Sequence, residues 1–202
     1  MIPEIPQPLH ASRSKRPGFT LIELLIVITI IAILATIIFA GGNYAIKKAR
    51  IAQAQKIAVD VANACTNFES EYNRMPIPTG AGTDWVGDTS EALTAILAGL
   101  DDTINKKEID FLDGVEQASG SPPAGGIDYL TNEAAPVIYD PWSNFFVVHL
   151  DGNYDKEVEN PEDSTQTLYN TRAAVLSKGE DNTAAGQNPQ GSNATNDNAK
   201  SW

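Results

Sequence analysis

One uninterrupted apolar run constrains this chain more than any other feature. Residues 19–40 read FTLIELLIVITIIAILATIIFA and contain a single charged side chain, Glu23. As a helix rising about 1.5 Å per residue, the run would be about 33 Å long, enough to cross a hydrocarbon core of about 30 Å. A secretory signal peptide has a shorter apolar core of about 7 to 15 residues. The run therefore predicts a membrane-spanning helix, with a buried core helix or a secretory signal as the alternatives.

The charges on either side of this run give conflicting indications of its orientation. Three basic residues precede it and three follow it: Arg13, Lys15 and Arg16, then Lys47, Lys48 and Arg50. The first group favours a cytoplasmic location for residues 1–18 and export of everything after them. The second group opposes that orientation. Local charge therefore leaves the topology open.

The junction before the run carries a recognisable pattern. Residues 15–24, KRPGFTLIEL, resemble the class III leader junction of type IV pilins and type II secretion pseudopilins, and the likeness extends over about residues 13–75. The resemblance implies that a prepilin peptidase cuts after Gly18 and that the new amino terminus, Phe19, is methylated. It also implies a single-pass protein of the bacterial inner membrane, with residues 1–18 as a removed cytoplasmic leader and the head in the periplasm.

Glu23 needs a partner if it lies in hydrocarbon, where an acidic side chain costs on the order of 2.5 to 3.5 kcal/mol on insertion scales. Cleavage after Gly18 would create an amino group four residues away from Glu23, about one helical turn. Every neighbouring subunit would offer the same group. The resemblance implies that Glu23 pairs with the Phe19 amine of an adjacent subunit and sets the axial register of a filament. In the alternative, Glu23 snorkels to the lipid headgroups.

A second helical pattern follows the run over residues 43–75. Its apolar residues recur at steps of three and four: Ala54, Ile57, Val61, Cys65, Phe68 and Tyr72. This spacing predicts an amphipathic helix whose apolar stripe faces a globular head, with Cys65 as a small buried hydrophobe. Gly41 and Gly42 lie between the two helical segments, and glycine weakens a helix interior by about 1 kcal/mol. We therefore predict that bending during assembly falls within residues 40–43.

Residues 76–202 are predicted to form a small head of mixed structure. Pro76 ends the long helix, a loop follows to residue 88, and residues 90–100 are typical of a short helix with Leu93, Ile96, Leu97 and Leu100 buried. Residues 145–150, FFVVHL, give the best strand signal, and residues 172–176 could return beside them. The predicted fold is α+β: a membrane helix (19–42) continuing as an amphipathic helix (43–75), packed on a small antiparallel sheet.

Further matches favour one branch of the superfamily. Residues 140–144, DPWSN, resemble the aspartate-proline-tryptophan-glycine turn of the major pseudopilins of type II secretion, with Ser143 in place of glycine. This resemblance implies a structural subunit whose polymerisation drives protein export. Its partners would be copies of itself, minor pseudopilins, an inner-membrane assembly platform and the membrane. The alternatives are a type IV pilin for adhesion, motility or DNA uptake and, in another class, a membrane-anchored monomeric binding module.

The C-terminal segment contains a candidate calcium site. Residues 176–181, LSKGED, followed by Asp197 and Asn198, resemble the C-terminal calcium loop of the major pseudopilins. The spacer is longer here, and one of the paired acids is an amide. The resemblance implies that Asp181, Asp197 and Asn198 supply oxygen ligands to Ca²⁺, which prefers carboxylate, amide and carbonyl oxygens. The alternative is a disordered polar tail.

A second acidic segment competes for the ion. Its oxygen-bearing residues fall at positions 1, 3, 5 and 12 of an EF-hand-like loop: Asp151, Asn153, Asp155 and Glu162. However, Lys156 occupies the position that calls for glycine, and Pro161 precedes the last ligand. A solvated hairpin is therefore the alternative to calcium binding at this segment.

Composition excludes several functions. The chain has 26 acidic and 14 basic residues and a formal charge of −12, so nucleic acid is not expected as a partner. Cys65 is the single cysteine, which rules out an internal disulfide. His149 would be the only histidine of the mature chain, and the sequence has no serine-centred elbow or phosphate loop. We therefore expect no enzymatic activity.

Overall fold

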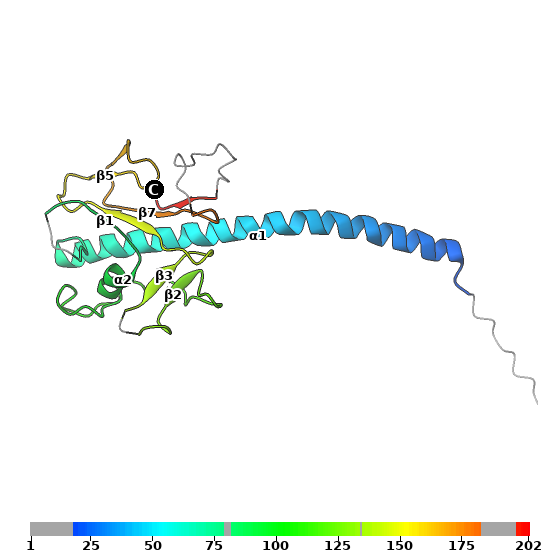
Figure 1. Cartoon of the computed structure of the whole chain (residues 1–202), viewed down its shortest axis with the longest axis horizontal. Helices are drawn as coiled ribbons and strands as arrows, with labels where there is room; N and C mark the ends of the chain where they lie inside the picture. The colour runs from blue at the N-terminus through cyan, green and yellow to red at the C-terminus, as the bar shows by residue number, and fades with distance from the viewer. Residues whose placement is uncertain (1–17, 79–81, 134, 183–196) are drawn as a thin grey trace, which may run out of the picture. The chain divides into compact units, whose positions relative to one another are not determined.

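The structure is a computed structural model that describes residues 18–78, 82–133, 135–182 and 197–202, without the side chains of 39–41 and 91. The chain divides into two compact units, Met1–Tyr44 and Ala45–Trp202. One helix, α1 (Leu21–Tyr72), contributes residues to both of them (Figure 1). Its backbone is helical throughout residues 40–43, so the predicted bending there stays a prediction about the assembled state.

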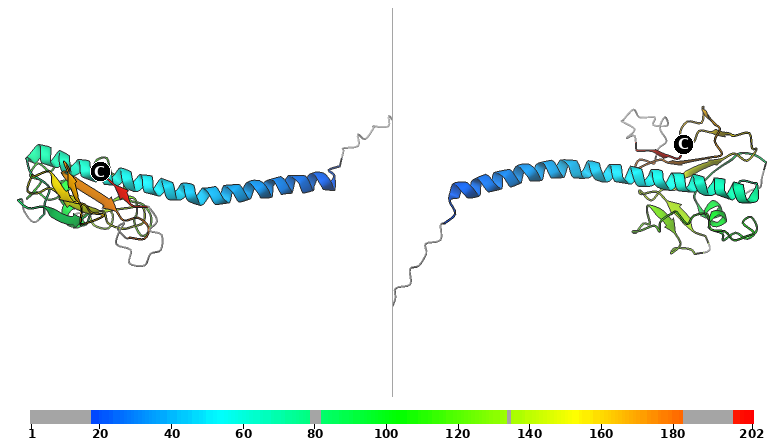
Figure 2. Two further views of the ribbon diagram at one scale, coloured as in Figure 1. Left: turned by 90° about the horizontal axis from the view of Figure 1, so that it is seen from above. Right: turned by 180° about the vertical axis from the view of Figure 1, so that it is seen from behind.

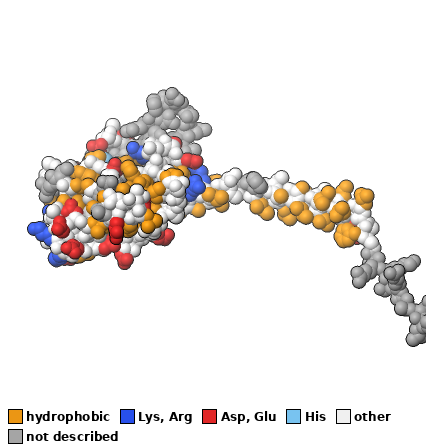
Figure 3. Space-filling view, turned by 60° about the horizontal axis from the view of Figure 1, so that its bottom comes forward, with side chains coloured by type: hydrophobic (Ala, Val, Ile, Leu, Met, Phe, Trp, Pro, Cys, Tyr) orange, Lys and Arg blue, Asp and Glu red, His pale blue; other side chains and the backbone are white. Residues whose placement is uncertain are grey.

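The first unit presents an apolar helical surface. Every large apolar side chain from Leu21 to Ile38 is at least 44% exposed (Figure 3). Exposed apolar surface is unfavourable in water by about 25 cal/mol per Å². Among the described residues, α1 is the one helix that is long and apolar enough to cross a membrane. This segment is therefore suited to lipid or to the surface of other helices.

In the second unit, α1 is covered on its apolar stripe. The predicted residues Ala54, Ile57, Val61, Cys65 and Phe68 are all at most 3% exposed. Tyr72, the last of the stripe, packs partly buried against the same core. The helical spacing of the apolar residues was sufficient to identify this face.

An antiparallel sheet packs on this part of α1. Its strands, in spatial order, are β1 (Trp85–Asp88), β4 (Val147–Leu150), β7 (Ala173–Ser177) and β8 (Ala199–Lys200). Val148 of β4 lies opposite Val175 of β7, and both belong to one core with α1. The architecture is therefore α+β, as predicted, with β4 and β7 paired as the sequence indicated.

Smaller elements complete the second unit. They are α2 (Glu91–Leu97) and two hairpin-like pairs, β2 (Gly126–Asp128) with β3 (Val137–Tyr139) and β5 (Glu157–Glu159) with β6 (Thr167–Tyr169). In the view of Figure 1, β7 lies above α1, and α2 and the β2–β3 pair lie below it. The view from above in Figure 2 shows these elements against one face of the helix, which carries the core of the head.

Two sequence expectations about the head are wrong. Residues 85–88 were expected in a loop but form β1, because they pair with β4 along its whole length. Leu100 was expected on the buried side of the short helix but is 47% exposed. The helix ends at Leu97, and Gly99 then takes a left-handed conformation with φ of +77°, which redirects the chain before Leu100.

Candidate functional site

The start of α1 places Glu23 against Thr20. The backbone N–H and the hydroxyl of Thr20 donate to Oε2 of Glu23, at 2.8 and 2.7 Å. In return, the N–H of Glu23 donates to the Thr20 hydroxyl oxygen at 3.3 Å. This reciprocal pattern is a capping box, which satisfies N–H groups that every helix leaves without a partner at its start. The Glu23 carboxylate is therefore hydrogen-bonded within its own subunit.

The predicted cleavage site lies just before this capping box. Gly18 and Phe19 precede α1 in non-helical backbone, and both are exposed. The structure therefore brings Gly18, Phe19 and Glu23 together at one end of the helix. Sequence reasoning singled out these three but missed Thr20, although the spacing of threonine and glutamate three residues apart is a readable signal for a cap.

The residues of the predicted C-terminal calcium loop have other contacts. Asp197 accepts a hydrogen bond from the N–H of Glu180 at 3.2 Å, and its Oδ2 lies 3.7 Å from Nζ of Lys47. The side-chain amide of Asn198 donates to Glu162. Asp181 is exposed. The described contacts therefore direct Asp197 and Asn198 to different partners.

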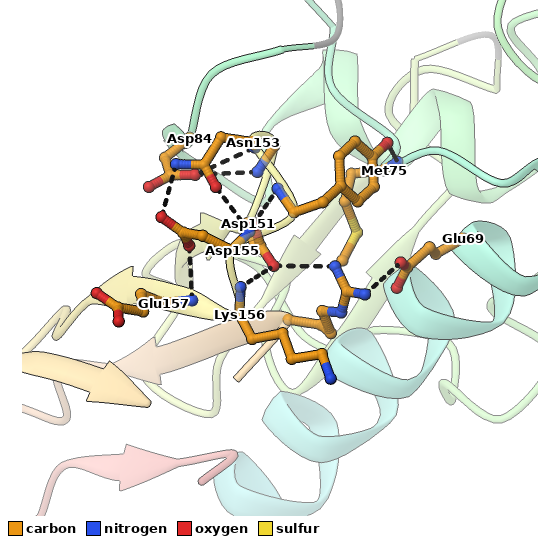
Figure 4. A network of polar contacts seen from close by, with 11 residues as sticks. Glu69, Met75, Asp84, Asp151, Asn153, Asp155, Lys156 and Glu157 are labelled. Atoms are coloured by element: carbon orange, nitrogen blue, oxygen red, sulfur yellow. Dashed lines mark hydrogen bonds and ion pairs between the residues drawn. The ribbon is translucent and has the colours of Figure 1, made fainter. Parts of the chain in front are cut away.

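The EF-hand-like residues also do not form a shared site. Asp151 accepts hydrogen bonds from two backbone N–H groups and from Nη1 of Arg172 at 3.0 Å (Figure 4). Asn153 and Asp155 bond to each other. Glu162, the predicted last ligand, forms an ion pair with Lys200.

A bound Ca²⁺ takes six to eight oxygen ligands. Among the residues that the structure describes, no group of three histidine, cysteine, aspartate or glutamate side chains could hold a metal ion. Lys47 and Arg172 place positive charges at the central carboxylate of each candidate. The described side chains therefore present no cluster of carboxylates for a calcium ion at either segment, and calcium binding there stays a prediction.

The turn at residues 140–144 is fixed by a buried carboxylate. Oδ1 of Asp140 accepts the N–H groups of Trp142 and Asn144, both at 2.9 Å, and Oδ2 accepts the hydroxyl of Ser177 on β7 at 2.7 Å. Burial raises the pKa of the Asp140 carboxyl. Ser143 has φ of +66°, a left-handed conformation that explains why the resembling turn has glycine at this position. The turn thus joins the start of β4 to β7.

His149 on β4 is a buried polar residue of the head, with 6% of its surface exposed. Its Nδ1 lies 2.8 Å from the carbonyl oxygen of Glu159 on β5. Because a carbonyl only accepts, Nδ1 carries the proton. Burial lowers the pKa of His149 below its ordinary value. The neutral ring therefore links β5 to the sheet.

Acidification is expected to destabilise the head through His149. The unfolded chain takes up a proton near the ordinary pKa of 6.5, whereas the folded chain does so only at lower pH. The unfolded state then binds more protons, so stability decreases as the pH falls below that value. Thermal unfolding of the wild type and His149→Gln at pH 7 and pH 5 measures the effect. We expect a smaller loss in the variant, and equal losses would contradict this role.

Comparison with protein families gives one match. Residues 13–39 match the prokaryotic N-terminal methylation motif, a segment that includes Gly18, Phe19, Thr20 and Glu23. The match supports the pilin and pseudopilin superfamily, processing by prepilin peptidase and assembly into filaments. The apolar start of α1 is compatible with single-pass membrane anchoring. Comparison with curated proteins and with solved structures gave no match.

Proposed function

We propose that this chain is a structural subunit of a type II secretion pseudopilus, a short periplasmic fibre whose growth drives protein export. One observation carries the filament assignment: Glu23 is the single charge in the exposed apolar run of residues 19–40, and it lies within the segment that matches the N-terminal methylation motif. The likeness of residues 140–144 to the turn of the major pseudopilins supports the secretion branch of the superfamily.

Assembly follows from two properties of this helix. Prepilin peptidase cuts after Gly18 and frees the amine of Phe19, which becomes a positively charged partner for the Glu23 carboxylate of a neighbouring copy. Packing of the apolar helix against its copies replaces lipid contacts, and it avoids exposure to water, which costs about 0.8 kcal/mol per CH₂ group.

The capping box gives Glu23 a partner before assembly. Thr20 supplies two hydrogen bonds to the carboxylate in the isolated subunit, which offsets part of the cost of an acidic group in hydrocarbon. A neighbour's amine can then bind the same carboxylate as a charged donor, which forms a stronger hydrogen bond than a neutral one. This contact would also fix the axial offset between neighbouring copies. The offset equals the separation of Phe19 and Glu23 along the chain, about one helical turn.

Site-directed crosslinking tests the filament against a monomeric anchored module. Subunits carrying Ile22→Cys are expressed together with differently tagged subunits carrying Ile26→Cys, which matches the four-residue stagger between Phe19 and Glu23. We expect mixed crosslinked dimers from this pair and none from Ile22→Cys with Ile37→Cys. Burial raises the pKa of Cys65 to about 12, so the native thiol stays unreactive. Equal, background-level crosslinking of both pairs would favour the monomeric module.

Microscopy of the same cells separates the two filament types. A secretion pseudopilus predicts fibres confined to the periplasm and loss of exported proteins when the subunit is deleted. Surface fibres together with normal export would favour a type IV pilin. Either result leaves the crosslinking outcome unchanged, so the two questions are answered independently.

A further inference from the structure

Asp197 is a buried carboxylate near the C-terminus of the chain, with none of its surface exposed. A charge placed out of water requires hydrogen bonds and a compensating charge. The N–H of Glu180 donates to its Oδ2 at 3.2 Å, and Nζ of Lys47 lies 3.7 Å from the same oxygen. Nζ of Lys47 is also 3.9 Å from Oε2 of Glu180. One ammonium of α1 therefore faces two carboxylates of the C-terminal part of the head.

The backbone at Gly179 leaves room for the Asp197 side chain. Gly179 has φ of +71°, and a Cβ at this position would lie 2.5 Å from Oδ1 of Asp197. The side-chain amide of Asn144 donates to the Gly179 carbonyl at 3.2 Å, which fixes the loop from the turn at residues 140–144. A side chain at position 179 would displace Asp197, so the glycine keeps the carboxylate within reach of Lys47.

We infer that Lys47 supplies the positive charge that holds the C-terminal segment, residues 197–202, on the head, in the place where the resemblance implies a calcium ion. A divalent cation bound to Asp197 would lie close to this ammonium, and the repulsion between the two charges opposes its binding. Asn198 makes a second contact between this segment and the head, because its side-chain amide donates a hydrogen bond to Glu162.

The other acidic segment of the head is held in the same way (Figure 4). Asp151 is fully buried, and Nη1 of Arg172 donates to its Oδ2 at 3.0 Å. Nη2 of the same guanidinium lies 3.4 Å from Oε1 of Glu69 on α1. A basic side chain of the protein thus lies beside a buried aspartate at both segments.

The ion pair between Lys47 and Asp197, called the Lys47 clamp below, joins two defined places in the chain. Lys47 lies in the first turn of α1 within the second unit, which begins at Ala45. Asp197 lies two residues before β8, whose residues pair with the end of β7. The clamp therefore fastens the last strand of the head to the helix near the point where that helix enters the head.

Hydrogen exchange of the full-length protein in detergent tests this clamp. We expect amide exchange over residues 197–202 to be the same in excess calcium chloride and in excess chelator. In Lys47→Gln, exchange of this segment is expected to be roughly tenfold faster under both conditions, because a buried carboxylate loses its compensating charge. Arg50→Gln is the matched control, since it removes one positive charge from the exposed side of α1 one turn later. Its exchange should equal that of the wild type.

Two results would overturn the inference. Slower amide exchange of residues 197–202 in the wild type when calcium is added would show that a bound metal holds the segment on the head. Equal exchange rates in Lys47→Gln and Arg50→Gln would show that Lys47 does not hold it. The double variant Lys47→Gln, Asp197→Asn completes a mutant cycle, and we expect it to recover part of the lost protection. If Lys47→Gln fails to fold, two measurements remain. Exchange of residues 197–202 in the wild type should be the same in calcium and in chelator, and Lys47→Arg, which keeps the positive charge, should retain the wild-type protection.

Discussion

Replacing Glu23 with glutamine is expected to reduce filament growth by at least tenfold while leaving the start of α1 folded. Glutamine has nearly the same size and can occupy the same position in a capping box, so Thr20 keeps its partner. The amide has no charge, however, and cannot form an ion pair with the freed amine of Phe19 on a neighbouring copy. The variant therefore removes the contact between subunits and preserves the contact within the subunit.

Fibre yield, measured by shearing or gentle extraction followed by electron microscopy, is the readout for Glu23→Gln. Thr36→Val is the control for a polar group in the same apolar segment, because its hydroxyl donates to the Ile33 carbonyl of its own helix at 2.7 Å. It should assemble normally. Leader removal should also be normal in both variants. Filaments of wild-type length, spacing and growth rate in Glu23→Gln would show that the carboxylate does not set the register.

The parts of the fold that were predictable depend on local, repeated patterns. The stripe from Ala54 to Phe68 is visible because a helix returns to the same face every three or four residues. The pairing of β4 with β7 was predictable because each strand is rich in β-branched and apolar residues and is bounded by turn residues. The junction from Gly18 to Glu23 was readable for the same reason, since all of its members lie within six consecutive residues.

The missed parts depend on contacts between distant residues. β1 contains Gly87 and an exposed Val86, and it is a strand because β4 offers it a pairing edge. The acidic segments matched metal loops by the spacing of oxygen-bearing residues. Spacing does not reveal that Arg172 and Lys47, far away in sequence, lie at the central carboxylates. Countercharges of this kind come from tertiary structure.

Replacing Gly18 with valine is expected to leave the protein uncleaved, with at least a tenfold loss of mature chain. Nothing in the structure requires glycine at this position for folding: a Cβ there would have no atom within 4 Å, and the backbone precedes α1 in an exposed segment. We therefore attribute the expected requirement for glycine to the peptidase, which on the proposed function would approach the peptide bond between Gly18 and Phe19 closely. The precursor would keep its leader, and no Phe19 amine would be available to Glu23.

A shift in gel mobility and mass spectrometry of the amino terminus, for cleavage and for methylated Phe19, measure this outcome. Gly42→Val is the matched control, because Gly42 also has no atom within 4 Å of a Cβ and lies in α1. It should be cleaved and methylated as in the wild type. Filament yield should fall together with cleavage in Gly18→Val, because the Phe19 amine is never freed, whereas in Glu23→Gln it should fall although cleavage is normal. Normal processing of Gly18→Val would place the mature amino terminus elsewhere, and the pairing between Glu23 and Phe19 would then lose its chemical basis.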